Sequence, residues 1–211
     1  MKLYYHPISI NCRKALMVAA VLGIDLELQL LDVGKGAHGS PEYLAINPNG
    51  MIPTLEDDGF VLWESNAIAQ YLTSKSATSA LFPSDRQLRA DVSRWQFWDV
   101  AHWSRPVQTL AFERLYKRAV GLGEPETSAV EKAIRDFHQF AAVLNSHLDG
   151  REFIVGKGLT LADLSIASGL TFAGPAALPV AQYKSVQRWF ASIERLDAWK
   201  RTAPAGDGLQ P

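Results

Sequence analysis

The hydrophobic and polar positions of the first third of the chain follow strand-like and helix-like patterns in turn. Residues 2–6 are rich in β-forming side chains, and Pro7 interrupts this run. From about Asn11 the apolar positions fall near one helical face, up to Gly23, which is typical of a helix C-cap. Residues 26–33 then alternate between apolar and polar side chains. These segments predict a β-α-β unit whose helix has the length of a parallel crossover.

The next segment predicts a loop, a β-hairpin and a second helix. The expected elements are a flexible loop (34–41), a short turn (42–46), a turn with the sequence Asn-Pro-Asn-Gly (47–50), two strands (52–56 and 60–63) joined by a tight turn (57–59), and a helix from Glu64 through about Leu72. The first domain is therefore β-α-β, loop, β-β-α, and we assign it residues 1–75.

A Ser-rich stretch with a proline near its end follows, and we predict that residues 76–84 are a linker between domains. Beyond it the pattern is helical. Residues 85–118 form one long helical stretch, which we expect to kink or split at Pro106 because proline interrupts the helical hydrogen-bond ladder. The second domain, residues 85–211, is therefore predicted to be all-α.

Three further helices are predicted within this second domain. The first spans residues 125–149, with Pro125 in its first turn. It carries a regular apolar stripe made of Val130, Ile134, Phe137, Ala141, Leu144 and Leu148. A variant of the capping box, Thr160 with Asp163, starts the second helix, and residues 186–196 form the third. Residues 203–211 are too rich in Pro and Gly to pack, and we expect them to fray.

Composition narrows the class of protein. The chain has 211 residues, 47% of them hydrophobic and 20% charged, which is ordinary globular usage. A net charge of −1 gives no electrostatic footprint for nucleic acid. The sequence contains no run of about 18 apolar residues, so no membrane span is expected. Pro7 interrupts the N-terminal segment before the apolar core of a signal peptide could form. With one cysteine, no intrachain disulfide can form, and a cytoplasmic location is expected.

Ser9 and Asn11 are the first residues that can carry chemistry. They follow the first strand at the start of the first helix, where ligands commonly bind in α/β units. Exposed N–H groups and the positive end of the helix dipole favour an anion there, and a Ser hydroxyl can donate to a thiolate or a phosphate. A purely structural role as an N-cap explains the same residues.

A second candidate is the segment Asn49 to Pro53. Ile52 precedes a proline and is therefore extended, which leaves its backbone N–H and C=O available to pair with an extended peptide ligand. A hairpin entry without a ligand is the alternative. Spacing does not decide between a cis and a trans bond before Pro53.

The third candidate is Glu64 with Ser65, at the start of the second helix. The Ser65 hydroxyl and N–H can hold a carboxylate, and Glu64 can hold an ammonium group, so together they suit an α-amino-acid head group. A capped helix alone explains this pair equally well. The three candidates together suit a small anionic peptide with an amino-acid head at one end and a thiol at the other.

Over nearly its whole length the chain resembles the soluble glutathione S-transferases. The resemblance rests on Ser9-Ile10-Asn11, on residues 47–55, on Glu64-Ser65-Asn66-Ala67-Ile68 and on Leu159-Thr160-Leu161-Ala162-Asp163, in this order and at the family's spacing. It is greatest to the serine-dependent theta-like and phi-like branches and their bacterial relatives. It implies a thioredoxin-like N-terminal domain, an all-helical C-terminal domain and a homodimer. It also implies glutathione as co-substrate, a small electrophilic second substrate, and no cofactor or metal.

The resemblance assigns roles to particular residues. It places Ser9 at the glutathione sulfur with support from Asn11, and a cis proline at Pro53. It places the Ile52 backbone at the cysteinyl unit, and Glu64 and Ser65 at the γ-glutamyl end. His38 would lie near the glycyl carboxylate. Met51 stands where many members carry Gln or a basic residue, so contacts to the glycyl end are expected to be thinner.

Other residues offer alternatives to this assignment. Tyr5 stands where the tyrosine-dependent classes keep their catalytic hydroxyl. Cys12 lies two residues beyond the position of the cysteine in a bacterial class, and would favour a glutathione-dependent thiol/disulfide reductase. A non-catalytic binding module with the same fold is a third hypothesis. The candidates for the electrophile pocket are Tyr5, Trp98, His102, Trp103 and Phe112, although aromatic residues at helical spacing are usually core residues.

Overall fold

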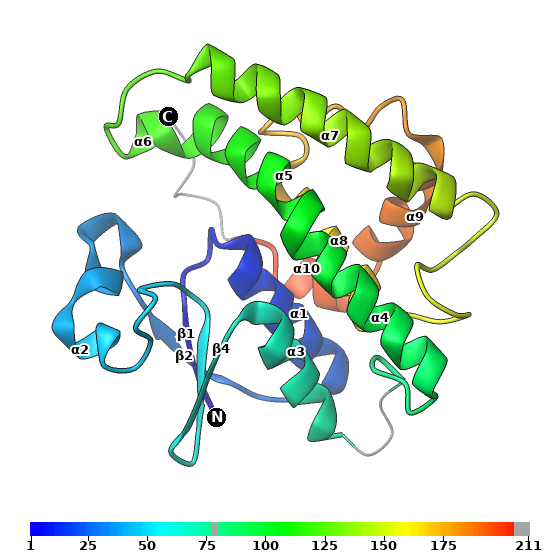
Figure 1. Cartoon of the computed structure of the whole chain (residues 1–211). Helices are drawn as coiled ribbons and strands as arrows, with labels where there is room; N and C mark the ends of the chain where they lie inside the picture. Colours follow the sequence, from blue (N-terminus) through cyan, green and yellow to red (C-terminus); the bar gives the residue numbers. More distant parts are fainter. Residues whose placement is uncertain (77–79, 205–211) are drawn as a thin grey trace. The chain divides into compact units, whose positions relative to one another are not determined.

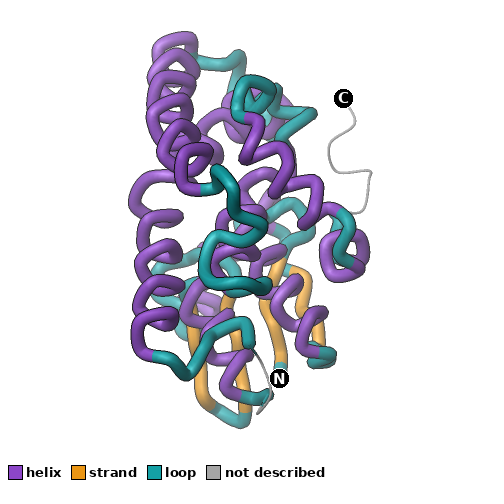
Figure 2. Tube along the Cα trace, turned by 90° about the vertical axis from the view of Figure 1, so that its right-hand side faces the viewer, coloured by secondary structure: helices purple, strands orange, loops and turns teal. Residues whose placement is uncertain are grey.

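The computed structural model describes residues 1–76 and 80–204. These residues form two compact units, one made of residues 1–76 with 197–204 and one made of residues 80–196. Strands occur only in the first unit, and the described part of the second consists of helices and loops (Figures 1 and 2). Three of the nine positions predicted as linker, 77–79, lie outside the described residues, as do 205–211 of the tail.

The first unit has the predicted order of strands and helices. Strand β1 (Lys2–Tyr5) leads through helix α1 (Ile10–Leu22) to β2 (Glu27–Leu30), which pairs with β1 in parallel. Strands β3 (Thr54–Asp57) and β4 (Phe60–Trp63) form an antiparallel hairpin, and helix α3 (Ser65–Ser74) follows. The sheet order is β2-β1-β3-β4, and β3 is antiparallel to β1. Helices α1 and α3 pack side by side, which brings their N-termini together.

The segment predicted as a flexible loop, residues 34–41, contains short ordered turns. The 3₁₀ turns η1 (Val33–Lys35) and η2 (Ala37–Gly39) are followed by the short helix α2 (Pro41–Leu44). Side-chain caps order this region, because Asp32 Oδ1 accepts from Lys35 N at 3.1 Å and Ser40 Oγ accepts from Tyr43 N at 3.2 Å. Composition alone does not reveal such local hydrogen bonds.

The end of the chain adds an element that the sequence pattern does not indicate. Helix α10 (Asp197–Arg201) belongs to the first unit and packs on α1. It is too short to show a helical period, and its partner lies at the other end of the chain. Within the tail expected to fray, residues 203 and 204 follow this helix.

The long helical stretch of the second unit is interrupted twice. Helix α4 (Arg86–Trp98) passes into a π-helical segment, η3 (Asp99–Trp103), before α5 (Ser104–Ala111). The second π-helical segment, η4 (Phe112–Tyr116), leads to the short α6 (Lys117–Ala119). The first irregularity precedes Pro106 instead of falling on it, because a proline ring clashes with the carbonyl four residues earlier and lacks the N–H that would bond to it. Nothing in the sequence pattern predicted the second.

The remaining helices complete the second unit. They are α7 (Thr127–His147), α8 (Leu161–Ser168), the 3₁₀ turn η5 (Gly169–Phe172) and α9 (Lys184–Glu194). The predicted stripe of α7 is buried in its C-terminal half, at Phe137, Ala141, Leu144 and Leu148. Pro125 lies just before the N-cap Glu126, so the prediction of a first-turn position was wrong by two residues. No helix in the described residues is long and apolar enough to cross a membrane.

Candidate active site

Ser9 is the N-cap of α1. Its Oγ accepts a hydrogen bond from Cys12 N at 3.2 Å, and its backbone N–H donates to His6 O at 3.0 Å. The structural role considered for Ser9 is therefore real. A hydroxyl has one proton to donate as well as lone pairs to accept with. Ser9 is half-buried, so its hydroxyl can donate a hydrogen bond to an anion bound at the positive end of this 13-residue helix.

The N-termini of α1 and α3 are joined by a hydrogen bond. Ser65, the first residue of α3, donates from Oγ to Asn11 Oδ1 at 3.4 Å. Ser65 is buried, whereas the neighbouring Glu64 is exposed. Two of the three candidate segments are therefore brought together, with two sets of helix N-terminal N–H groups and one exposed carboxylate.

Glu64 has a backbone conformation that is rare for a residue with a side chain. Its φ of 72° lies in the left-handed region, and its ψ is 113°. Such a conformation costs about 1–3 kcal/mol and often occurs at functional sites, where the surrounding structure holds it. This conformation sets the direction in which the chain passes from β4 into α3. It also favours a binding role for Glu64.

The third candidate segment is fixed by a buried polar network. Asn47 Nδ2 donates to Met51 O at 2.8 Å and to Thr54 Oγ1 at 3.0 Å, and Tyr43 Oη donates to Met51 O at 2.7 Å. The Ile52–Pro53 peptide bond is cis, as the resemblance implied. Among the residues that the structure describes, none hydrogen-bonds to the N–H or C=O of Ile52. This backbone is therefore free to pair with an extended ligand.

His38 and Met51 are held by the loop that precedes β3. A Cβ atom on Gly50, which has φ of 61°, would lie 3.1 Å from His38 O, so glycine allows this close approach. The Nδ1 atom of His38 is buried and has no hydrogen-bond partner among the described residues. Met51 is 68% exposed, and only its backbone carbonyl takes part in the network. Both residues therefore border the segment that carries Ile52.

The alternatives to Ser9 differ in accessibility. Tyr5 is the last residue of β1 and is half-buried. Cys12 is fully buried, and burial raises the pKa of its thiol to about 11, although the neighbouring Ser9 hydroxyl lowers it somewhat. A buried, protonated thiol is a poor nucleophile. The structure therefore disfavours disulfide exchange through Cys12.

The aromatic candidates for the electrophile pocket belong to the second unit, except for Tyr5. Trp103 is fully buried, donates from Nε1 to Ile166 O at 3.1 Å and packs on Phe137. It is a core residue, so its assignment to the pocket was wrong. Trp98 is half-buried and stacks on Trp103 with ring centroids 6.1 Å apart. Phe112 is 40% exposed.

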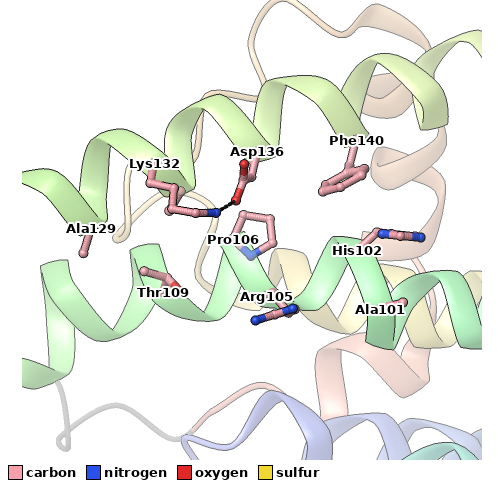
Figure 3. Close-up of a pocket in the computed structure, with 10 residues that line it drawn as sticks. Ala101, His102, Arg105, Pro106, Thr109, Ala129, Lys132, Asp136 and Phe140 are labelled. Atoms are coloured by element: carbon pink, nitrogen blue, oxygen red, sulfur yellow. Dashed lines mark hydrogen bonds and ion pairs between the residues drawn. The ribbon is translucent and has the colours of Figure 1, made fainter.

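His102 is exposed and lines a pocket of about 520 Å³ between α5 and α7. Figure 3 shows its ring at one end of this pocket near Phe140, with Arg105 on α5 and the ion pair of Lys132 and Asp136 on α7. Small residues such as Ala129 and Ala133 leave the space open. Sequence periodicity gave no signal for this pocket, because the pocket arises from side-chain volumes on two separate helices.

Among the described residues there is no cluster of metal-ligating side chains.

Comparisons with known proteins give the same family for the N-terminal and the C-terminal part of the chain. Residues 1–74 match the family model "Glutathione S-transferase, N-terminal domain", and residues 104–197 match "Glutathione S-transferase, C-terminal domain". A delta-class glutathione transferase of Nilaparvata lugens is 30% identical, with a TM-score of 0.82, over 96% of this chain and 94% of that one. Bombyx mori glutathione transferase BmGSTD1 is also 30% identical, with a TM-score of 0.82, over 97% and 89%. Glutathione transferase F7 of Populus trichocarpa is 25% identical, with a TM-score of 0.88, over 96% and 97%.

Proposed function

The chain belongs to the glutathione S-transferase family, and we propose that this enzyme conjugates the glutathione thiolate to small, largely apolar electrophiles. The observation that carries the proposal is the hydrogen bond between Ser65 and Asn11, which unites the N-termini of α1 and α3. This bond supports the proposal because the residues that we propose for the thiolate and for the amino-acid head then lie close together on one compact unit. We also propose a peroxidase side activity, because a thiolate attacks a peroxide as well as an electrophilic carbon.

Glutathione is a peptide, and the proposed site treats it as one. Ile52 pairs its free backbone groups with the cysteinyl unit. The γ-glutamyl carboxylate binds at the N-terminus of α3 through the backbone N–H of Ser65, and the exposed Glu64 carboxylate binds the ammonium group. His38 and Met51 border the glycyl end. Since Met51 offers no charge to the glycyl carboxylate, most of the binding energy comes from contacts with the γ-glutamyl and cysteinyl residues of glutathione.

Ser9 donates a hydrogen bond from its hydroxyl to the glutathione sulfur and so stabilises the thiolate. Asn11 holds the neighbouring turn against Ser65. A free thiol has a pKa of about 8.5, and lowering it by two units requires roughly 2.7 kcal/mol of preference for the anion. A hydrogen bond to a charged group contributes about 1.5–3 kcal/mol, and the helix dipole about 0.3–1 kcal/mol. These two effects suffice, and no strong general base is needed.

The second substrate is proposed to bind to an apolar surface. Of the sequence candidates, Tyr5, Trp98, His102 and Phe112 keep accessible surface and stay in the proposal, whereas Trp103 does not. The functional form is proposed to be a homodimer in the cytoplasm. Exposed apolar side chains support the dimer, namely Phe97 at 74% and Val100 at 51% on the second unit, and Phe60 at 49% on β4.

A steady-state assay tests the proposed function. We expect the protein to conjugate glutathione to 1-chloro-2,4-dinitrobenzene, and Ser65→Ala to raise KM for glutathione about tenfold, since it loses the hydrogen bond to Asn11 that joins the N-termini of α1 and α3. Ser74→Ala, at the exposed end of the same helix, is the matched control and should leave KM unchanged. Absence of conjugation, together with absence of binding at millimolar glutathione, would favour a non-catalytic module with this fold.

A further inference from the structure

The C-terminal helix α10 is attached to the helix turn that carries the proposed thiolate site. The link is Arg13, in the first turn of α1, and Trp199, in the middle of α10. The Arg13 guanidinium lies 3.6 Å from the centroid of the Trp199 ring, and its Nη2 donates to Trp199 O at 2.8 Å. Both residues belong to the same compact unit, although 186 positions separate them.

This contact is unusual for an arginine because it is buried and lacks a carboxylate. Arg13 is 3% exposed, and among the described residues no Asp or Glu forms an ion pair with it. Its Nε is buried with no hydrogen-bond partner among them. Burial of the cation lowers the Arg13 pKa to about 10. The ring and carbonyl of Trp199 are therefore the principal groups that hold this charge in place.

The same turn of α1 holds Ser9. The backbone N–H of Arg13 donates to Ser9 O at 2.9 Å, and the N–H of Cys12 donates to Ser9 Oγ at 3.2 Å. A shift or tilt of Arg13 therefore moves two of the three atoms to which Ser9 is hydrogen-bonded, the third being His6 O. Displacement of a catalytic group by about 1 Å is enough to lower a rate greatly.

We propose that Arg13 and Trp199 form a clamp through which the C-terminal helix positions Ser9 for stabilising the thiolate. Both are positioning residues in this account, and neither needs to touch the substrate. The inference rests on the proposed function and extends it to the end of the chain.

The test removes the ring and follows the thiol. We expect Trp199→Ala to raise the pKa of enzyme-bound glutathione by about 0.5–1 unit and to lower kcat at neutral pH about 1.5- to threefold, because a smaller fraction is ionised. KM for glutathione should change less than twofold, since Ile52, Glu64 and Ser65 lie on other segments. Trp199→Phe keeps an aromatic ring and should restore most of the activity. Arg13→Lys, which loses the planar group, should resemble Trp199→Ala.

The matched control is Arg89→Lys. Arg89 lies on α4 of the other unit, 4.4 Å from the centroid of the Phe82 ring, and it should leave the thiol pKa and kcat unchanged. Thermal unfolding is measured for every variant. If Trp199→Ala and Arg13→Lys lower the unfolding temperature but leave the bound thiol pKa and kcat as in the wild type, the contact is structural only and the clamp is refuted. If Trp199→Ala does not fold, Arg13→Lys and Trp199→Phe decide by the same readouts.

The two hypotheses fail in distinguishable ways. If wild-type protein does not ionise glutathione, the proposed function is wrong, whatever the variants do. If wild-type protein ionises glutathione and the two clamp variants ionise it equally well, only the clamp is wrong.

Discussion

Helices α1 and α8 both have a hydroxyl residue at the N-cap, and their N-termini differ in how fully their polar groups are used. At the start of α8, Thr160 and Asp163 form a closed capping box. The Asp163 carboxylate is completely buried and accepts from Thr160 N at 2.9 Å, from Ile154 N at 2.8 Å and from Trp189 Nε1 at 3.0 Å. At the start of α1, the Ser9 hydroxyl accepts one backbone hydrogen bond, and the residue remains half-buried.

The difference shows what separates a structural helix terminus from a functional one. Both sequences have the same N-cap signal, so residue types alone do not distinguish them. At α8 the Thr160 hydroxyl donates to Asp163 and the Asp163 carboxylate accepts from several protein donors, so neither side chain is left for a ligand. At α1 a hydroxyl proton and a positive helix end remain available to an anion. Variants of the two termini should therefore fail in different ways.

Removal of the closed cap should have the largest effect. Asp163→Ala would leave several buried donors without an acceptor, at about 1–3 kcal/mol for each, so we expect a loss of roughly 3 kcal/mol or more in the free energy of unfolding. Denaturant unfolding measures this loss. Asp163→Asn, which keeps an acceptor oxygen, should lose less. An unchanged midpoint for Asp163→Ala would show that the two termini do not differ as described.

Removal of the open cap should reduce the rate more than the stability. Ser9→Ala is expected to lower kcat by one to three orders of magnitude, equivalent to about 1.4–4 kcal/mol, because the thiolate loses its donor. The lost cap should cost only about 1 kcal/mol of stability. Steady-state kinetics and unfolding are compared with those of Thr160→Ala, which should lose stability and keep kcat. Retained turnover in Ser9→Ala, with loss in Tyr5→Phe, would transfer the role to Tyr5.

The buried network before β3 should show an intermediate effect, on both binding and stability. Asn47→Ala leaves the carbonyl of Met51 and the hydroxyl of Thr54 with one partner fewer, so we expect a loss of about 1–3 kcal/mol in unfolding free energy. Because Ile52 follows directly, KM for glutathione should also rise. Isothermal titration with glutathione checks this, and an unchanged Kd in a destabilised variant would separate the network from the site.

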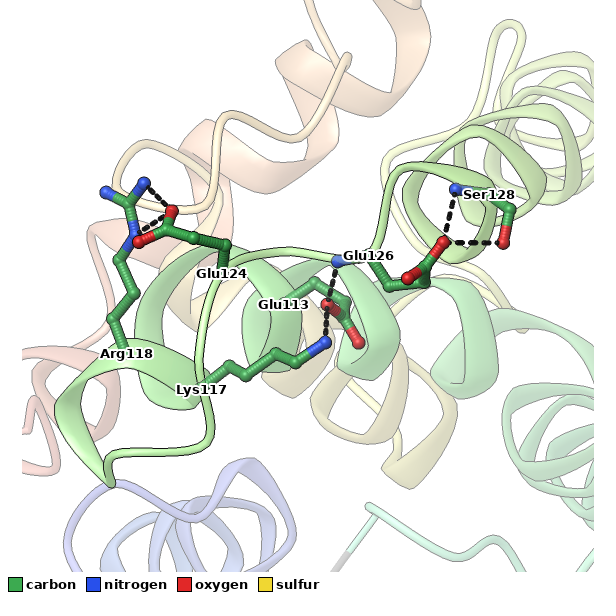
Figure 4. Close-up of polar contacts among 6 residues, drawn as sticks. All are labelled: Glu113, Lys117, Arg118, Glu124, Glu126 and Ser128. Atoms are coloured by element: carbon green, nitrogen blue, oxygen red, sulfur yellow. Dashed lines mark hydrogen bonds and ion pairs between the residues drawn. The ribbon is translucent and has the colours of Figure 1, made fainter.

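A third helix terminus sharpens the comparison through its pH dependence. The N-cap residue of α7, Glu126, donates its N–H to Glu113 Oε2 at 2.7 Å, and Lys117 Nζ donates to the same oxygen at 2.9 Å (Figure 4). The backbone hydrogen bond and then Lys117 hold the Glu113 pKa below its usual 4.5. The ionised carboxylate therefore stabilises the fold above this pH, and the contribution is lost as the pH falls through the lowered pKa.

Of the four predicted effects, the one at the N-terminus of α7 should be the smallest. Glu113→Gln should be less stable than the wild type at neutral pH, and the two unfolding curves should converge as the pH falls below 4.5. Lys132→Gln, which breaks the exposed ion pair with Asp136, is the control and should change stability very little. A difference between wild type and Glu113→Gln that persists unchanged at acidic pH would contradict the account.

The parts of the fold that could be predicted from sequence depend on local patterns. The β-α-β and β-β-α order, the capping box at Thr160 and the hydroxyl at the start of α1 each involve residues within a few positions of one another. Helix α10 and the contact between Arg13 and Trp199 could not be predicted, because they depend on packing between the two ends of the chain. The same holds for the site. The pattern predicted Ser9 and Ser65 as candidates, but the hydrogen bond from Ser65 to Asn11 and the burial of Cys12 and Trp103 depend on packing between segments distant in the sequence.

The central claim is that the open terminus of α1 ionises glutathione, and the most direct measurement follows this ionisation itself. Thiolate absorbance in the ultraviolet is recorded for the complex of enzyme and glutathione across pH, for wild type and for Ser9→Ala. The account predicts a bound thiol pKa about two units below the free value of ~8.5 in the wild type, and a value close to the free one in Ser9→Ala. Glutathione that binds wild-type protein without a lowered pKa, or that ionises equally well in Ser9→Ala, would contradict it.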